Sequence, residues 1–132
     1  MTTTVGTRRP LDLLRLALRL DAVVTGANGL AYVATATLLS SLLGVPPGTL
    51  RGLGTFLVVF AAAVALVAGR RRVPAGAVEV VVGANLLWAA GSVAAVTTDR
   101  FDLTAVGTAW VLVQAAVVAG FAVLQAAGLR RS

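Results

Sequence analysis

LRGLGTFLVVFAAAVALVAG, residues Leu50 to Gly69, carries a single charged side chain, Arg51, in a run that is otherwise almost wholly apolar. A helix needs roughly 20 apolar residues to cross a hydrocarbon core of about 30 Å, and this run has that length. Three more runs of the same kind fill most of the remaining chain. They are Ala22 to Leu43, Ala77 to Val96 and Leu103 to Ala127. The sequence therefore predicts an all-α fold, a bundle of four transmembrane helices.

The composition indicates that lipid covers much of the apolar surface. Of the 132 residues, 58% are hydrophobic and 12% are charged, and the mean hydropathy is +0.94. A soluble domain of this size has too much surface to hide so many apolar side chains. The lipid bilayer is therefore an expected partner.

The residue types also exclude several kinds of chemistry. The sequence has no cysteine and no histidine, which removes disulfides, thiol chemistry and the usual ligands of zinc and haem. No pairing of a nucleophile with a general base is visible. We therefore expect no catalytic residue, no metal and no cofactor, and a protein that is not an enzyme.

The arginines lie at the ends of the apolar runs. The net charge is +6 and all basic residues are arginine, which indicates a GC-rich bacterial gene. Because they form no basic face, we expect no nucleic-acid partner. The positive-inside rule predicts a bacterial inner-membrane protein with both termini and the middle loop in the cytoplasm. On that side are Arg8, Arg9, Arg15, Arg19, Arg70, Arg71, Arg72, Arg130 and Arg131, against Arg51 and Arg100 on the other.

Two regions are expected along the chain. Residues 1–20 form a cytoplasmic leader, in which Pro10 to Leu20 reads as a short amphipathic helix that runs into the first span and lies at the membrane interface. Residues 21–132 form a single transmembrane domain. Within it, Gly26-Ala27-Asn28 recurs as Gly83-Ala84-Asn85, and Gly54-Thr55 as Gly107-Thr108. These echoes predict two parallel helical-hairpin repeats, at about residues 21–72 and 77–131; chance similarity in a chain rich in Ala, Val and Gly is the alternative.

Polar side chains inside the runs are the candidates for function. In the first run they recur at helical spacing on one stripe, and an ionisable group at membrane depth is costly to keep without a use. We expect Asp21 near the cytoplasmic boundary but interior, and Glu79 in an interfacial ion pair. Both are candidate ionisable sites for a proton or a cation. The candidate residues of a polar cavity between the repeats are Asp21, Thr25, Asn28, Tyr32, Asn85, Trp88, Ser92 and Gln114. Hydrogen bonds that merely join helices are the alternative.

The chain resembles the small four-span integral membrane proteins of high-GC bacteria such as actinobacteria. The resemblance rests on its length, the arginine-flanked leader, the run Leu18 to Asp21 and the asparagine in each odd span, and it carries over no site residue. Small multidrug transporters share the size, but they place a glutamate where this chain has Asn28 and Tyr32. We expect an accessory or structural component that associates with itself as a homo-oligomer or with another membrane protein. The alternative is a small transporter or channel-like module for a cation or a small amphiphile.

Overall fold

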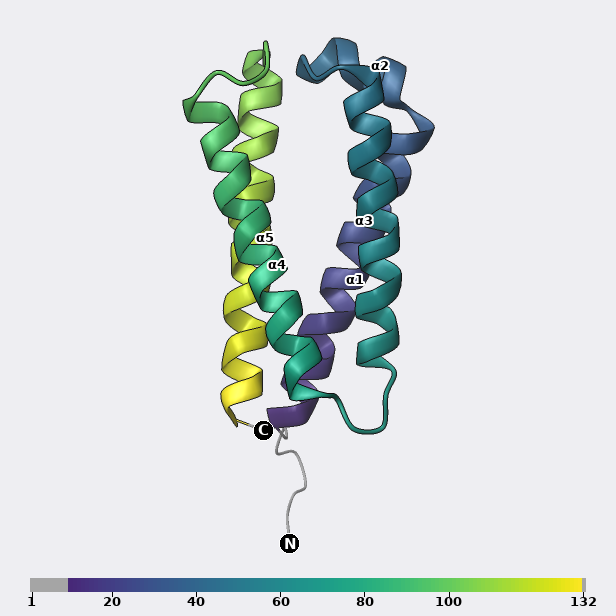
Figure 1. The fold of residues 1–132 in the computed structure, drawn as a ribbon, viewed down its shortest axis with the longest axis vertical. Coiled ribbons are helices and arrows are strands. Elements are labelled where there is room, and N and C mark those ends of the chain that lie inside the picture. Colours follow the sequence, from purple (N-terminus) through teal and green to yellow (C-terminus); the bar gives the residue numbers. More distant parts are fainter. Residues whose placement is uncertain (1–9, 132) are drawn as a thin grey trace, which may run out of the picture.

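The computed structural model describes residues 10–131 of the chain, with side chains over 13–130. The described part contains five helices: α1 (Pro10–Ala34), α2 (Ala36–Leu43), α3 (Pro47–Ala68), α4 (Ala75–Thr97) and α5 (Ala105–Arg131) (Figure 1). Residues 10–131 contain no strand. The prediction of an all-α fold is confirmed.

Three of these helices, α3, α4 and α5, are long and apolar enough to cross a membrane. Helices α1 and α2 pass the same test as a pair, although they are bent by 97° at the break between them. The described residues therefore hold three such helices, or four spans if the bent pair counts as one.

The bend falls at Thr35, within the run Ala22 to Leu43 that was expected to form one helix. The backbone of Thr35 leaves the helical conformation there, with φ −123° and ψ 30°, and its hydroxyl donates a hydrogen bond to the carbonyl oxygen of Ala31 at 2.6 Å. Gly44 ends α2 with a φ of 83°, the left-handed conformation that glycine adopts at helix C-termini. An unbroken helix over this run was a wrong prediction. The long helix ends at Ala34, and α2 turns across the end of the molecule (Figure 1).

The first part of α1 belongs to the helical core. Leu14 and Leu18 are buried against Val64, Ala68 and Val78, and the helix continues without a break to Ala34. The helix expected over Pro10 to Leu20 is therefore formed and runs directly into the rest of α1. Protein covers Leu14 and Leu18, whereas Leu16 and Leu20 are exposed. The rest of the leader, residues 1–9, lies outside the described residues.

The basic residue Arg15 lies inside this long helix, where its guanidinium group binds backbone carbonyl groups at the end of α3. Its Nη1 donates hydrogen bonds to the backbone carbonyl oxygens of Ala68 and Arg70, the latter at 2.7 Å. Carbonyl groups at a helix C-terminus lack partners within the helix, and arginine commonly supplies them. Arg15 thus fastens the start of α1 to the end of α3.

The helices pack as two hairpins, α1 with α3 and α4 with α5 (Figure 1). The first hairpin closes tightly at Gly29 and Gly54, where a Cβ atom on either glycine would come within 2.8 Å of the other helix. Small residues at such points let helix backbones approach each other. Helix α1 also packs along α5, whereas α3 and α4 scarcely touch.

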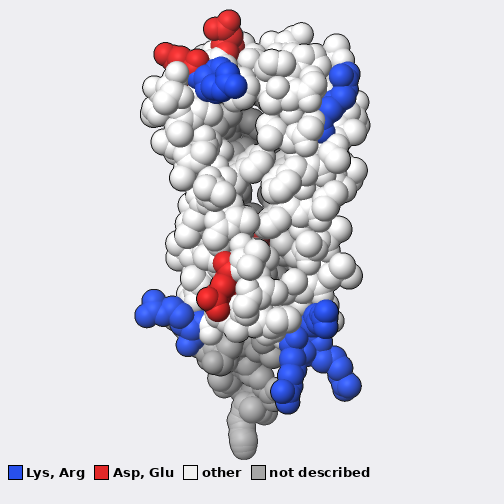
Figure 2. Space-filling view, in the orientation of Figure 1, with Lys and Arg blue, Asp and Glu red and all other residues white. Residues whose placement is uncertain are grey.

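The hairpins converge at the end where the described chain begins and separate toward α2 (Figure 1). On the α2 side, the backbone N–H and hydroxyl of Thr104 donate to the carbonyl oxygens of Leu43 and Leu42, at 3.0 and 2.6 Å. These bonds tie α2 to the start of α5. In Figure 2, charged side chains gather near the two ends of the molecule, and the long, mostly uncharged band between them is hollowed along its middle.

Candidate functional site

The centre of the molecule holds a buried carboxylate surrounded by hydrogen-bond donors. Asp21, on α1, is 0% exposed. The Thr25 hydroxyl donates to its Oδ1 at 2.8 Å, while Asn85 Nδ2 and Gln125 Nε2 donate to its Oδ2 at 2.7 and 2.8 Å. Asn85 Nδ2 also donates to Gln125 Oε1 at 3.1 Å. One side chain from α4 and one from α5 are thus joined to α1 through this carboxylate.

The carboxyl group of Asp21 pairs with no basic side chain among the described residues. Taking a carboxylate out of water without an opposite charge is costly, and more so at membrane depth. The three donors compensate part of that cost. A buried carboxyl group held by three hydrogen-bond donors, without a basic partner, is the most distinctive chemical feature of the described residues.

Asp21 is interior to the helix bundle, as the sequence predicted. At a rise of 1.5 Å per residue, it is about 16 Å along α1 from Pro10. The expected position near the cytoplasmic boundary assumed that the span begins at Ala22. Because α1 begins at Pro10, the carboxylate lies well inside the helical part of the molecule.

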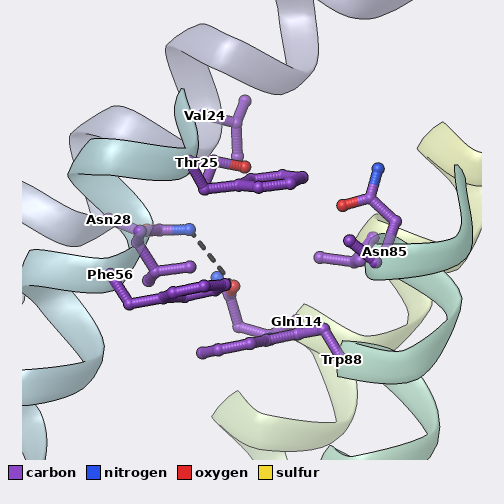
Figure 3. A pocket seen from close by; sticks show the side chains of 11 residues that line it. Val24, Thr25, Asn28, Phe56, Asn85, Trp88 and Gln114 are labelled. Carbon is purple, nitrogen blue, oxygen red and sulfur yellow. Dashed lines mark hydrogen bonds between the residues drawn. The ribbon is translucent and has the colours of Figure 1, made fainter. Parts of the chain in front are cut away.

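A second set of hydrogen bonds joins α1 to α5 further along α1, on the side of the Asp21 cluster that faces α2. Asn28 Nδ2 donates to Gln114 Oε1 at 3.2 Å, and the Trp110 indole N–H donates to the Tyr32 hydroxyl at 2.8 Å. Between the Asn28–Gln114 bond and the Asp21 cluster lies a small cavity of about 20 Å³ (Figure 3). Thr25 and Asn85 point toward each other across it (Figure 3).

A much larger groove, of about 390 Å³, lies between the two hairpins on the α2 side of this cavity. Five of the seven aromatic residues of the chain line this groove, although aromatic residues make up only 5% of the sequence. Phe56 of α3 and Trp88 of α4 stack across the interval between the hairpins, with ring centroids 6.0 Å apart and planes 6° apart. Both rings border the groove and the small cavity. The aromatic residues of the groove are Tyr32, Phe56, Trp88, Phe101 and Trp110.

The other candidate residues have simpler surroundings. Ser92 lines the groove, but its hydroxyl donates to the carbonyl oxygen of Trp88 in its own helix at 2.8 Å. Glu79 is exposed on α4 and forms no ion pair with any residue in the described part. The interfacial ion pair expected for it is therefore absent there, because α4 turns this side chain outward.

Four residues of the site, Gln125, Phe56, Phe101 and Trp110, were not among the sequence candidates. Gln125 completes the Asp21 cluster, and Phe56 forms the aromatic wall of the cavity. Gln125 had a visible signal, since it lies eleven positions after Gln114 and so on the same face of a helix. Phe56 had none, because an aromatic residue in an apolar run is ordinary.

No family model, no curated protein and no solved structure matches this chain. The geometry of the groove and of the carboxylate cluster must therefore carry the functional argument.

Proposed function

We propose that this chain is a non-enzymatic, four-span membrane protein of the bacterial inner membrane that binds a small amphiphile in the groove between its two hairpins. This is the transporter or channel-like alternative raised by the sequence, narrowed to one ligand class. The observation that carries it is the aromatic groove of about 390 Å³.

The proposed topology counts α1 and α2 as one span. Four spans put both termini and the loop between α3 and α4 on one side of the membrane. That loop contains Arg70, Arg71 and Arg72, all exposed, so the positive-inside rule favours the cytoplasm for this side. The two hairpins would then correspond to the two proposed repeats.

The size and lining of the groove favour an amphiphile. Pockets for small molecules measure about 300–1,000 Å³ and are mostly apolar with a few polar groups. The lining here is largely aliphatic and aromatic, with no charged side chain, and it includes Gln114, whose Nε2 has no hydrogen-bond partner in the described chain. An apolar body against the rings and a polar head at Gln114 fit this arrangement.

The position of the groove supports the same ligand class. The backbones of α3 and α4 lie mostly apart, and the molecule is hollowed along its middle (Figure 2), which supports access to the groove from the side on which these helices would face lipid. An amphiphile already dissolved in the bilayer could enter there without crossing water.

An accessory or self-associating role, which was the leading expectation from the sequence, would use a different surface of the protein. Gly76 and Gly83 are exposed on α4, and a Cβ on either would meet no atom within 4 Å. Such a face leaves room for another helix, but small residues do not specify a partner. The groove has both a defined volume and a defined chemistry, so we prefer the ligand-binding function.

The groove can be tested with N-phenyl-1-naphthylamine, a fluorescent amphiphile, added to the protein in lipid nanodiscs. Energy transfer from tryptophan to the bound dye should saturate, because both tryptophans of the chain, Trp88 and Trp110, line the groove. Gly91→Phe should weaken binding at least about tenfold by filling the groove, since Gly91 lines it and has open space at its Cβ.

Gly83→Phe is the matched control for this substitution. Gly83 lies on the same helix with equally open space, but it does not line the groove. Binding should be unchanged in this variant. Transfer that rises without saturation, or equal weakening by both substitutions, would exclude the groove as the binding site.

A further inference from the structure

We propose that the amphiphile bound in the groove is a quinone, an uncharged flat ring whose carbonyl oxygens accept hydrogen bonds from Tyr32 and Gln114. This inference rests on the proposed function and adds the chemical class of the ligand. Three properties of the groove lining carry it: the hydrogen-bond groups that lack a partner, the spacing of those groups, and the kinds of side chain around them.

The hydrogen-bond groups left over at the groove are donors. Tyr32 accepts a hydrogen bond from the Trp110 indole at 2.8 Å, but its own hydroxyl proton reaches no acceptor among residues 13–130. Tyr32 is only 7% exposed. Gln114 accepts from Asn28 through its Oε1, which leaves its Nε2 protons without an acceptor in the same part of the chain. A buried donor without an acceptor is costly, so a ligand that supplies acceptor oxygens is favoured.

The two donors lie about one helical turn apart where α1 and α5 border the groove. Tyr32 follows Asn28 by four residues on α1. Gln114 follows Trp110 by four residues on α5. The two hydrogen bonds that join these helices are therefore about 6 Å apart along the helix axes. A quinone carries carbonyl oxygens on opposite sides of one ring, so it can offer an acceptor to each donor.

The lining favours an uncharged head on the ligand. No Asp, Glu, Lys or Arg side chain lines the groove, and an ion without a partner is costly to bury. A carboxylate or phosphate head would accept from both donors, but its charge would stay unbalanced. An ammonium head has only donors to offer, and these would face the donors of Tyr32 and Gln114. A carbonyl oxygen on a neutral ring avoids both penalties.

The aromatic residues of the groove favour a flat ring over an aliphatic head. Phe56 and Trp88 lie parallel to each other at its border (Figure 3), and Tyr32 and Trp110 line it from α1 and α5. The faces of aromatic rings are electron-rich, whereas the carbonyl groups of a quinone draw electrons from its ring. Stacking of a quinone on these residues is therefore favourable. An alkyl tail can leave between α3 and α4, whose backbones lie mostly apart.

Radiolabelled menadione, a naphthoquinone, tests this ligand class directly. We would measure its binding to the protein in nanodiscs of zwitterionic lipid and subtract its partition into empty nanodiscs. Binding to the wild type should saturate. Tetraphenylphosphonium, an aromatic cation, should compete at least about tenfold more weakly than unlabelled menadione, because the groove offers no negative charge to balance it.

The Tyr32 hydroxyl is tested in the Trp110→Phe background, since Tyr32→Phe alone would free the Trp110 N–H as a substitute donor. In that background, Tyr32→Phe should weaken menadione binding about three- to tenfold, the effect of one hydrogen bond. Binding of N-phenyl-1-naphthylamine should not change between the two proteins, because the dye carries an N–H donor and no carbonyl oxygen. Trp88 remains as the donor for energy transfer, so the dye reports whether the groove is intact.

The Gln114 amide is tested by Gln114→Met, which keeps a long side chain without the N–H donors. Menadione binding should again weaken about three- to tenfold. Asn28→Leu is the matched control, because it breaks the same bond between α1 and α5 but leaves the Gln114 amide in place. Asn28 does not line the groove, so this variant should bind menadione like the wild type.

Several outcomes would overturn the assignment of a quinone. They are dye binding without saturable menadione binding, equal competition by tetraphenylphosphonium, unchanged menadione affinity in both donor variants, equal weakening of dye and menadione by those variants, and equal weakening by Gln114→Met and Asn28→Leu. The first of these would leave the amphiphile function standing without its ligand class. Absence of saturable binding for both ligands would refute the proposed function as well.

Discussion

Asn85 and Asn28 are the same residue type at corresponding positions of the two proposed repeats, yet their surroundings differ. Asn85 is buried and donates to both Asp21 and Gln125. Asn28 is half-buried and makes one bond of 3.2 Å. Hydrogen bonds between membrane helices contribute about 0.6 kcal/mol on average, whereas leaving a buried polar group without its hydrogen-bond partner costs roughly 1–3 kcal/mol.

We therefore expect Asn85→Leu to lower the free energy of unfolding by about 2–3 kcal/mol, and Asn28→Leu by only about 0.6 kcal/mol. Unfolding by sodium dodecyl sulfate in mixed micelles, followed by circular dichroism, measures both. Since the two substitutions change volume and polarity identically, each serves as the control for the other. Equal losses of stability would show that the hydrogen bonds of Asn85 in the Asp21 cluster stabilise the fold no more than the single bond of Asn28 does.

Only part of this cluster could be predicted from the sequence. The stripe containing Asp21 and Thr25 follows from helical spacing, and both residues lie in the cluster. Gln125 was passed over because the sequence does not reveal which residue of α5 meets Asp21. That depends on the antiparallel run of α5 along α1 (Figure 1) and on the rotation of each helix about its axis, which packing decides.

At the scale of the helices, the contact between Gly29 and Gly54 holds the first hairpin together. A Cβ at position 54 would lie 2.7 Å from the backbone oxygen of Gly29 and 2.8 Å from the Tyr32 side chain. Gly54→Ala should therefore destabilise the protein by about 1–3 kcal/mol, because α1 and α3 must move apart. The same detergent unfolding measures this loss.

Gly52→Ala is the matched control on the same helix, since its Cβ would meet no atom within 4 Å. Alanine favours a helix over glycine by up to roughly 1 kcal/mol, so this variant should be as stable as the wild type or slightly more so. If Gly54→Ala were as mild as Gly52→Ala, the close packing of α1 on α3 would be refuted.

The helices themselves were predictable where hydropathy marks their ends. The runs beginning at Leu50, Ala77 and Leu103 fall within a few residues of α3, α4 and α5. The first run failed because two physical facts are invisible to hydropathy. Arg15 is accommodated by carbonyl groups at the end of α3, which lets α1 start early, and the backbone of Thr35 leaves the helical conformation, which breaks the run within apolar sequence.

At the scale of the whole molecule, the asymmetric packing of the hairpins bears on the proposed repeats. Helix α1 packs along α5, whereas α3 and α4 scarcely touch. An exact twofold axis would make these two contacts equal. The backbones of the hairpins therefore approach each other mainly between α1 and α5, whereas α3 and α4 meet through side chains, such as the stacked rings of Phe56 and Trp88 beside the groove.

The proposed topology gives the last prediction, and the absence of cysteine from the chain makes it simple to test. Single cysteines would be introduced by Thr4→Cys, Ser41→Cys, Gly69→Cys, Thr98→Cys and Arg130→Cys and probed with a membrane-impermeant maleimide on spheroplasts. Ser41→Cys and Thr98→Cys should react on intact spheroplasts. The other three should react only after lysis, because four spans put both termini and the loop after α3 inside.

Each outcome of this labelling assigns one span. The cysteine-free wild type sets the background, and labelling after lysis confirms that every site is accessible. If Gly69→Cys and Thr98→Cys react from the same side of the membrane, α4 does not cross it. Reaction of Thr4→Cys on intact spheroplasts would place the N-terminus on the same side as α2, and the bent α1–α2 pair would then not cross the membrane. The fourth span, on which the cytoplasmic position of both termini depends, would be lost.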